Sequence, residues 1–223
     1  MHIEPGVVDG AKILLSIGTA AAAFVVSGKH ISKHVKTDGL SSLVSKTFLA
    51  TLAVFVFFEV FPQHSVGISE VHLILGSSIF LMFSLAPAVL GLTFGLLIQG
   101  LFFDQQDLPQ YFMNITTLLA PMMVMAALAP KIIDENTKYT DLTYTQTLKL
   151  SAIYQSGIIA WVSFWAFYGT GFTAESMISV GTFGAAYLTV ILIEPIFDLG
   201  LLYVAKRLKP VSNLFFNQRL YKA

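Results

Sequence analysis

The chain has 223 residues, of which 55% are hydrophobic and only 12% are charged, with a formal net charge of zero and a mean hydropathy of +0.73. A soluble domain carries about 25% charged residues, so this chain lacks the polar surface that a water-soluble globular protein needs. The absence of cysteine excludes disulfides and thiolate metal ligands. The composition therefore indicates a membrane protein, and we expect a single transmembrane domain over residues 1–223.

The N-terminal segment opens with Met1-His2-Ile3-Glu4-Pro5-Gly6, and no signal-peptide pattern follows it. A free N-terminal amine, the amide nitrogen of His2 and the imidazole of His2 are three nitrogens that can chelate one metal ion together. A ligand set made only of nitrogens suits Ni(II), Cu(II) or Co(II) better than Mg²⁺ or Ca²⁺. We therefore expect residues 1–9 to form a metal-capping segment, with one coordination position left for a further histidine.

Seven apolar stretches, bounded by turn residues or charges, predict an all-α polytopic membrane protein with a seven-helix bundle over residues 10–203. They are Gly10–Val26, Thr47–Phe61, Val71–Ala86, Ala88–Phe103, Ile115–Ala129, Leu148–Tyr168 and Ile178–Tyr203. Pro87 predicts a tight hairpin at Leu85–Ala88, because proline disfavours helix in the residue before it. Gly91 and Gly95 form a small-xxx-small pattern, which allows two helices to approach closely.

Basic residues lie on alternate sides of the expected spans. Only Lys12 of the 13 Lys and Arg residues lies in the N-terminal segment. The expected loops 62–70, 104–114 and 169–177 contain none, whereas the basic residues gather in 27–46, 130–149 and the tail 204–223. Because cytoplasmic loops are enriched in Lys and Arg, this pattern predicts an outside N-terminus and a cytoplasmic C-terminal tail.

The five histidines differ in their expected roles. With this orientation, His72 lies on the outer side at the depth of His2, so it is the candidate for the remaining metal ligand; the alternative is a polar residue at a helix start. His64 in the same outer loop is either a further candidate or a solvated loop residue. His30 and His34 stand four residues apart among lysines in the first cytoplasmic connection. We expect them to form a solvated interaction surface.

Acidic residues gather on the predicted outer side, where a negative mouth would attract divalent cations. They are Glu4, Asp9, Glu59, Glu70, Asp104, Asp107 and Glu175. Two further acids, Glu194 and Asp198, stand four residues apart inside the last expected span. Carboxylates within a membrane are costly and are functional candidates for transport or partner docking. The alternative is that Lys206 or Arg207 neutralises them.

Five short segments form a recognisable set: Met1-His2-Ile3 with Gly6, Val71-His72-Leu73, Leu85-Ala86-Pro87-Ala88, Gln99-Gly100-Leu101-Phe102-Phe103, and Asn114. This set resembles the cobalt/nickel substrate-capture subunits of energy-coupling factor transporters, the CbiM/NikM family. The resemblance covers roughly the first 130 residues, and the last 90 match by hydropathy alone. The chain departs from the family pattern at Glu4-Pro5-Gly6 and at Ser69-Glu70, which precedes His72.

The resemblance implies a transported metal, Co²⁺ or Ni²⁺, held by the Met1 amine, the amide and imidazole of His2, and His72. It also implies that Gln99 and Asn114 orient a ligating imidazole or the N-terminal strand. Glu70 and His64 are further candidates for this surrounding shell because they lie close to His72 in the sequence. No organic cofactor is expected.

The same resemblance implies a protein of a bacterial or archaeal cytoplasmic membrane that works with a transmembrane coupling subunit and cytoplasmic ATPase subunits. Its other surroundings are membrane lipid, and no nucleic acid is expected. The chain contains no Gly-x-x-x-x-Gly-Lys-[Ser/Thr] motif, so it has no P-loop with which to hydrolyse ATP. We therefore expect a transport component and not an enzyme.

Two alternatives stay open at the level of the sequence. The chain could work alone as a slow facilitator of metal entry. It could also be a proton-coupled or facilitative secondary transporter of a small solute that uses Glu59, Glu194 and Asp198. A membrane-embedded hydrolase is disfavoured, because no His-Glu-x-x-His motif or histidine cluster is present.

Overall fold

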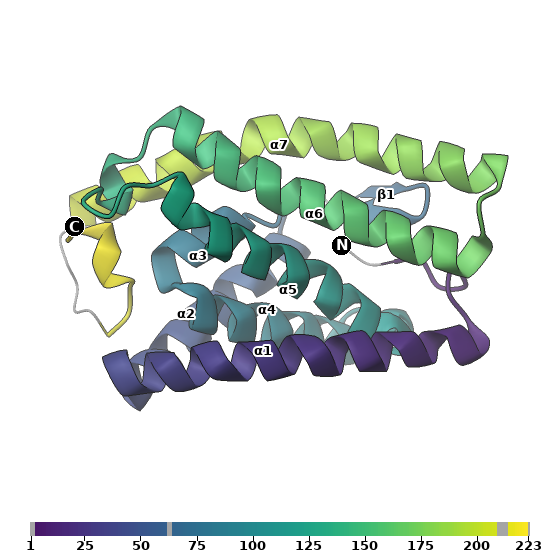
Figure 1. Ribbon diagram of the computed structural model, residues 1–223, viewed down its shortest axis with the longest axis horizontal. Coiled ribbons are helices and arrows are strands. Elements are labelled where there is room, and N and C mark those ends of the chain that lie inside the picture. The colour runs from purple at the N-terminus through teal and green to yellow at the C-terminus, as the bar shows by residue number, and fades with distance from the viewer. Residues whose placement is uncertain (1–2, 62–63, 209–213, 223) are drawn as a thin grey trace.

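The computed structural model describes residues 3–61, 64–208 and 214–222. Over this range the chain forms seven α-helices and one two-stranded antiparallel hairpin, with the long helices side by side along the molecule (Figure 1). The helices are α1 Leu14–Asp38, α2 Leu40–Glu59, α3 Gly76–Phe83, α4 Leu85–Phe102, α5 Tyr111–Leu128, α6 Tyr144–Thr170 and α7 Ala174–Leu208; the strands are β1 His64–Val66 and β2 Ser69–Val71.

Six of these helices are long and apolar enough to cross a membrane, which confirms the expected all-α, multi-pass architecture for six of the seven spans. The exception is α3, which has eight residues and is therefore only about 12 Å long. The stretch Val71–Ala86 was expected to be a spanning helix, and that prediction is wrong. Its first residues belong to β2 and to a segment without regular secondary structure, 72–75, whose last residue, Leu75, has a left-handed φ of 52°.

The connections between the first four helices are shorter than expected. The region 27–46 was expected to be a loop, but α1 continues to Asp38 and α2 begins at Leu40. The turn is made at Gly39, whose φ of 88° favours glycine. The break before α4 falls at Ser84, with φ 71°, one residue before the predicted hairpin. Pro87 lies in the first turn of α4, where its missing N–H breaks no helical hydrogen bond.

Close packing of α2 against α4 forms part of the core, as the small-xxx-small pattern predicts. A Cβ on Gly91 would lie 2.5 Å from the Cβ of Ala50, and one on Gly95 would lie 2.4 Å from Val54 Cγ1. Both distances are well inside van der Waals contact. Glycine is therefore required at these two positions for the helices to approach as closely as they do.

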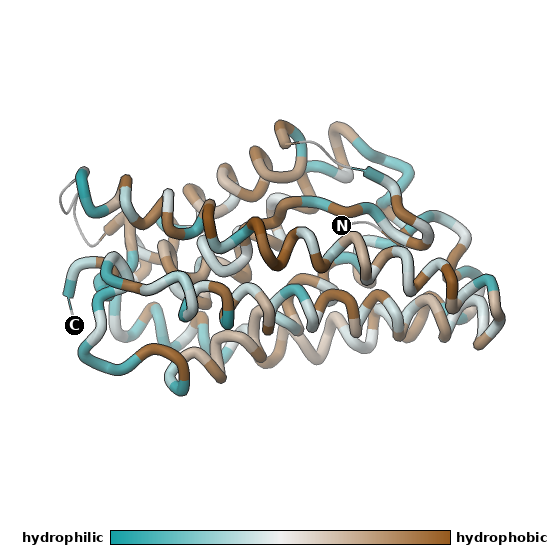
Figure 2. Tube along the Cα trace, turned by 90° about the horizontal axis from the view of Figure 1, so that it is seen from above, coloured by the Kyte–Doolittle hydropathy of each residue, from teal (hydrophilic) through white to brown (hydrophobic). Residues whose placement is uncertain are grey.

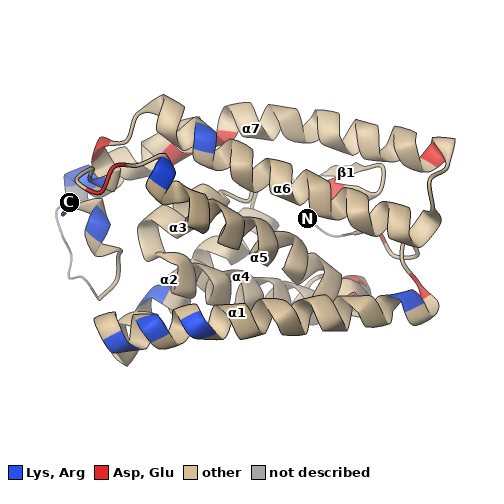
Figure 3. Cartoon of the chain, in the orientation of Figure 1, with Lys and Arg blue, Asp and Glu red and all other residues tan. Residues whose placement is uncertain are grey.

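Charge is distributed unevenly along the bundle. Figure 3 shows Lys and Arg gathered at the end that carries the C-terminus. Lys12 lies near the other end, where its Nζ donates to the carbonyl oxygen of Gly169 over 2.8 Å. Figure 2 shows apolar residues along the middle of the helices and hydrophilic segments toward their ends. This is the pattern of a bundle whose central zone lies in hydrocarbon.

Candidate functional site

The N-terminal segment folds back into the bundle beside the hairpin (Figure 1). Ile3 makes an isolated antiparallel bridge with Ser69, and the Glu4 N–H donates to the carbonyl oxygen of Ile68 over 3.1 Å. Ile3 is only 1% exposed and packs with Val8, Met113 and Trp165. The predicted ligands Met1 and His2 lie outside the described residues, immediately before this anchored segment.

Close backbone contacts fix where this segment and the hairpin lie. The segment passes so near α6 that a Cβ on Gly169 would lie 1.9 Å from the Val7 carbonyl oxygen. The hairpin turns at Gly67, with φ 65°, and a Cβ there would lie 2.8 Å from the Ser179 carbonyl oxygen on α7. The hairpin therefore lies between the N-terminal segment and α7 and contacts both.

Asn114, on α5, is bonded to the N-terminal segment. Its Oδ1 accepts a hydrogen bond from the Ile3 N–H over 2.9 Å, and its side chain is 1% exposed. A buried N–H without a partner would be costly, so this bond favours the inward position of the segment. That Asn114 orients a metal ligand stays a prediction.

His72 follows β2 directly and is buried, with 1% of its surface exposed. Its Nε2 lies 2.9 Å from Oε2 of the partly buried Glu70, and its ring lies 4.9 Å from the ring of Phe58 between centroids. Since Ser69 bridges to Ile3, the His72 imidazole stands three residues along the chain from the point where the N-terminal segment is anchored. The structure thus brings His72, Glu70 and the N-terminal segment together.

Acidic side chains gather near this hairpin. The members of the group interact electrostatically with one another; they are Glu4, Glu59, Glu70, Asp104 and Asp107. Gln99, fully buried in α4, donates from Nε2 to Asp104 Oδ2 over 3.2 Å. Its Oε1 has no hydrogen-bond partner within the described part of the chain. Asp9 and Glu175 are exposed elsewhere.

His64 does not join this acidic group. It lies on β1 opposite Val71 and is exposed to solvent. No set of three or more His, Asp or Glu side chains within residues 3–61, 64–208 and 214–222 is arranged to hold a metal ion. Within the described residues, the His, Asp and Glu side chains around His72 therefore do not complete a transition-metal site.

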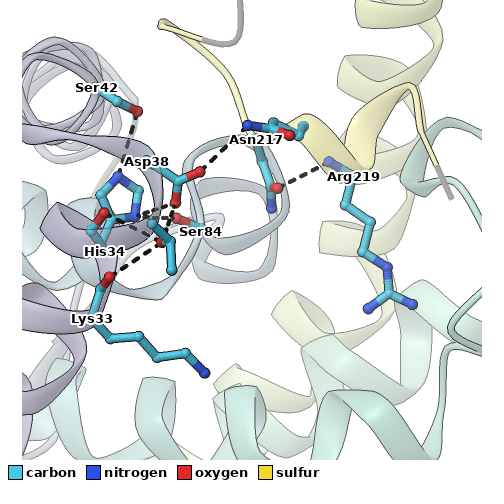
Figure 4. A network of polar contacts seen from close by, with 9 residues as sticks. Lys33, His34, Asp38, Ser42, Ser84, Asn217 and Arg219 are labelled. Carbon is cyan, nitrogen blue, oxygen red and sulfur yellow. Dashed lines mark hydrogen bonds and ion pairs between the residues drawn. The ribbon is translucent and has the colours of Figure 1, made fainter.

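His34 was expected to be a solvated residue, and that prediction is wrong. It is 6% exposed and lies among Asp38, Ser42 and Ser84, with its ring nitrogens 3.4–3.5 Å from their oxygens (Figure 4). Because α1 is helical here, the face that carries His34 turns toward α2 and the α3–α4 junction. His30, one turn earlier, is exposed as expected.

Glu194 and Asp198 are fully buried on α7, and neither of the expected basic residues neutralises them. Lys206 Nζ instead donates to Asp141 Oδ1 over 2.6 Å, and Arg207 lies over the ring of Tyr203 at 5.0 Å. The carboxylates accept hydrogen bonds from side chains on α3 and α6: Ser77, Ser78, Ser151 and Gln155. These four partners were not predicted from the sequence. The spacing of Ser151 and Gln155, two polar residues four positions apart in an apolar span, could have indicated a polar contact inside the bundle.

The helices, the uneven charge and the buried polar groups define a multi-pass membrane protein whose N-terminal segment folds into its helix bundle. The family model of the CbiM cobalt uptake substrate-specific transmembrane region matches residues 2–211. The chain belongs to this family: it is a substrate-specific transmembrane component of cobalt uptake and a non-enzymatic permease. The match confirms the resemblance and extends it from about residue 130 to residue 211. No curated protein and no solved structure matches the chain significantly.

Proposed function

We propose that this protein captures Co²⁺ or Ni²⁺ at the outer face of the membrane. In this proposal the ligands are the Met1 amine, the amide and imidazole nitrogens of His2, and the imidazole of His72. Cobalt as the transported substrate follows from the family. The supporting observation is the anchoring of Ile3, the residue that follows His2 in the chain, against Ser69 and Asn114; Ser69 lies three residues before the buried His72.

The surroundings of His72 suit a ligating histidine. Histidines that bind a metal commonly donate their other ring N–H to a carboxylate, which orients the ring and makes it a better ligand. Glu70 is placed to accept from Nε2 at 2.9 Å, so Nδ1 is the nitrogen that we assign to the metal. A set of nitrogen ligands accommodates both Co²⁺ and Ni²⁺, which differ in preferred geometry more than in donor type.

The proposed orientation has the N-terminus outside and the C-terminal tail 204–223 in the cytoplasm. The gathering of basic residues at one end of the bundle supports it through the positive-inside rule (Figure 3). The acidic group around Glu70 and Asp107 would then face the outside and raise the local concentration of divalent cations. We place the protein in the cytoplasmic membrane of a bacterium or archaeon.

Energy for uptake would come from other subunits, a transmembrane coupling subunit and cytoplasmic ATPases, because the sequence holds no P-loop motif. We propose the basic end of the bundle as their docking side. The alternative of a proton-coupled solute transporter is less favoured. Glu59 interacts with Asp104 and Glu70, whereas Glu194 pairs with Asp198, so the three acids do not form one relay.

The experiment that tests the N-terminal chelate adds one residue before Met1 and measures Co²⁺ and Ni²⁺ affinity of the purified protein by calorimetry. The extension displaces the free amine and leaves every side chain unchanged, so tight binding should be lost. A His64→Ala variant, altered at an exposed histidine of the same hairpin, is the control and should bind as the wild type does. Unchanged affinity of the extended protein would place the metal site elsewhere.

A further inference from the structure

We propose that Glu194 and Asp198, between the start of α3 and the facing sides of α6 and α7, form a buried site for a small oxygen-seeking monovalent cation, Na⁺ or a proton. This site is separate from the proposed metal ligands at the N-terminus and His72. It does not depend on which metal the protein captures, or on whether those ligands are assigned correctly.

Hydrogen bonds hold both carboxylates in fixed positions. Glu194 Oε2 accepts from the Ser151 hydroxyl and, over 2.8 Å, from Gln155 Nε2. Asp198 Oδ2 accepts from the Ser77 hydroxyl over 2.6 Å, and its Oδ1 accepts from Ser78. Three helices therefore converge on two acidic side chains that have no exposure to solvent.

Oxygen atoms without partners point to a missing ligand at this place. Within the described residues, Gln155 Oε1 and the Tyr154 hydroxyl are buried and make no hydrogen bond. In the same part of the chain Glu194 Oε1 has no side-chain partner, and the backbone N–H of Gly76 faces the Glu194 carboxylate. Gln155 belongs to the cluster because its amide nitrogen bonds Glu194. Tyr154 adjoins it because its ring packs on Gly76, where a Cβ would lie 2.1 Å from Cε1. Buried polar atoms in native proteins are normally satisfied, so several orphaned oxygens together indicate an occupant.

Charge leads to the same inference. No Lys, Arg or His in the described part of the chain forms an ion pair with either carboxylate, and the other titratable groups facing them are the phenols of Tyr154 and Tyr187. Two uncompensated negative charges in a low-dielectric interior are costly, and intramembrane acids are normally paired or protonated. The donor set is all oxygen, with no imidazole. Hard cations prefer such a set, whereas Co²⁺ and Ni²⁺ favour nitrogen.

The test measures the thermal unfolding midpoint, Tm, of the purified full-length protein in detergent after chelator treatment. NaCl replaces choline chloride at constant ionic strength and about pH 9, where protons compete least with Na⁺ for the carboxylates. If Na⁺ is the occupant, Tm should rise by about 3–6 °C at a tenfold excess over Kd. If a proton is the occupant, Na⁺ should have no effect and Tm should rise as the pH is lowered without Na⁺. A wild-type Tm that responds to neither cation would overturn the proposal.

Matched variants test whether the change in Tm arises from Glu194 and Asp198. The isosteric variants Glu194→Gln and Asp198→Asn, singly and together, should lose the dependence of Tm on Na⁺ or on pH. Glu175→Gln, at the exposed start of α7, should respond as the wild type does. If Glu194→Gln, Asp198→Asn and the double variant all respond as the wild type does, the cation binds elsewhere. Co²⁺ affinity measured on the same samples should stay within about twofold of wild type, which separates this test from that of metal capture.

Discussion

The imidazole of His72 lies between the carboxylate of Glu70 and the ring of Phe58, directly after the strand that anchors the N-terminal segment. We expect His72→Ala to lower Co²⁺ affinity by more than about 100-fold, because it removes a proposed ligand. Glu70→Gln should lower it by about 10–100-fold, the usual effect of losing a partner that orients a ligand. Calorimetric titration measures both. A His72→Ala protein with wild-type affinity would remove this residue from the site.

Proton competition is a second prediction for this residue. A histidine ligand must be neutral to bind a metal, and an ordinary imidazole has a pKa of about 6.5. Protonation therefore disfavours the bound state, so Co²⁺ affinity should fall as the pH drops through about 6. Equilibrium dialysis against Co²⁺ at about pH 7.5 and about pH 5 measures the change. Equal retention of metal at both values would argue against imidazole ligands.

The close contact between α2 and α4 depends on single glycines. A methyl group at Gly91 would meet Ala50 at 2.5 Å, so Gly91→Ala should destabilise the fold by about 1–3 kcal/mol through overpacking. Gly18→Ala, in α1, is the matched control. The space around its Cβ is open, and alanine favours helix, so the control should keep or raise stability. Thermal unfolding in detergent compares the two, and equal midpoints would contradict the close packing.

The hydrogen bond from the Ile3 N–H to Asn114 holds the N-terminal segment against α5. Asn114→Ala removes the acceptor of a buried N–H, at a cost of about 1–3 kcal/mol. We expect the segment to leave its position more often and bound Co²⁺ to dissociate about tenfold faster. Stopped-flow chelator competition measures the dissociation rate. A rate unchanged from wild type would mean that the anchoring of Ile3 does not support metal retention.

The orientation of the whole molecule is testable because the chain contains no cysteine. Single cysteines can replace exposed residues at opposite ends of the bundle: Glu175→Cys at the start of α7 and Glu135→Cys between α5 and α6. A membrane-impermeant maleimide added to intact cells should label the first and reach the second only after lysis. The reverse pattern would invert the proposed topology, and with it the assignment of the acidic group to the outer face.

Much of the architecture could be predicted from the sequence, because hydropathy and charge act over long stretches of chain. The spans other than Val71–Ala86 and the helix break near Pro87 follow from composition and local sterics. The short α3 could not be predicted, because its apolar residues fit a spanning helix equally well. Residues 72–75 stay outside the helix because of β2, the bridge from Ile3 to Ser69, and the carboxylates that hold the first turn of α3. These contacts join residues far apart in the chain.

The sequence by itself determined that this is a multi-pass membrane protein of a cobalt uptake family, since apolar run lengths and a few local motifs are sufficient for that. Only the tertiary structure decided how its polar residues are used. His34 is buried because α1 turns it inward, and Asn114 meets Ile3 from 111 positions away. Glu194 and Asp198 have hydroxyl and amide partners, whereas Lys206 or Arg207 was one of the alternatives that the sequence left open. The burial of a polar side chain and its hydrogen-bond partners depend on which helix faces pack together, and a local sequence pattern does not specify that packing.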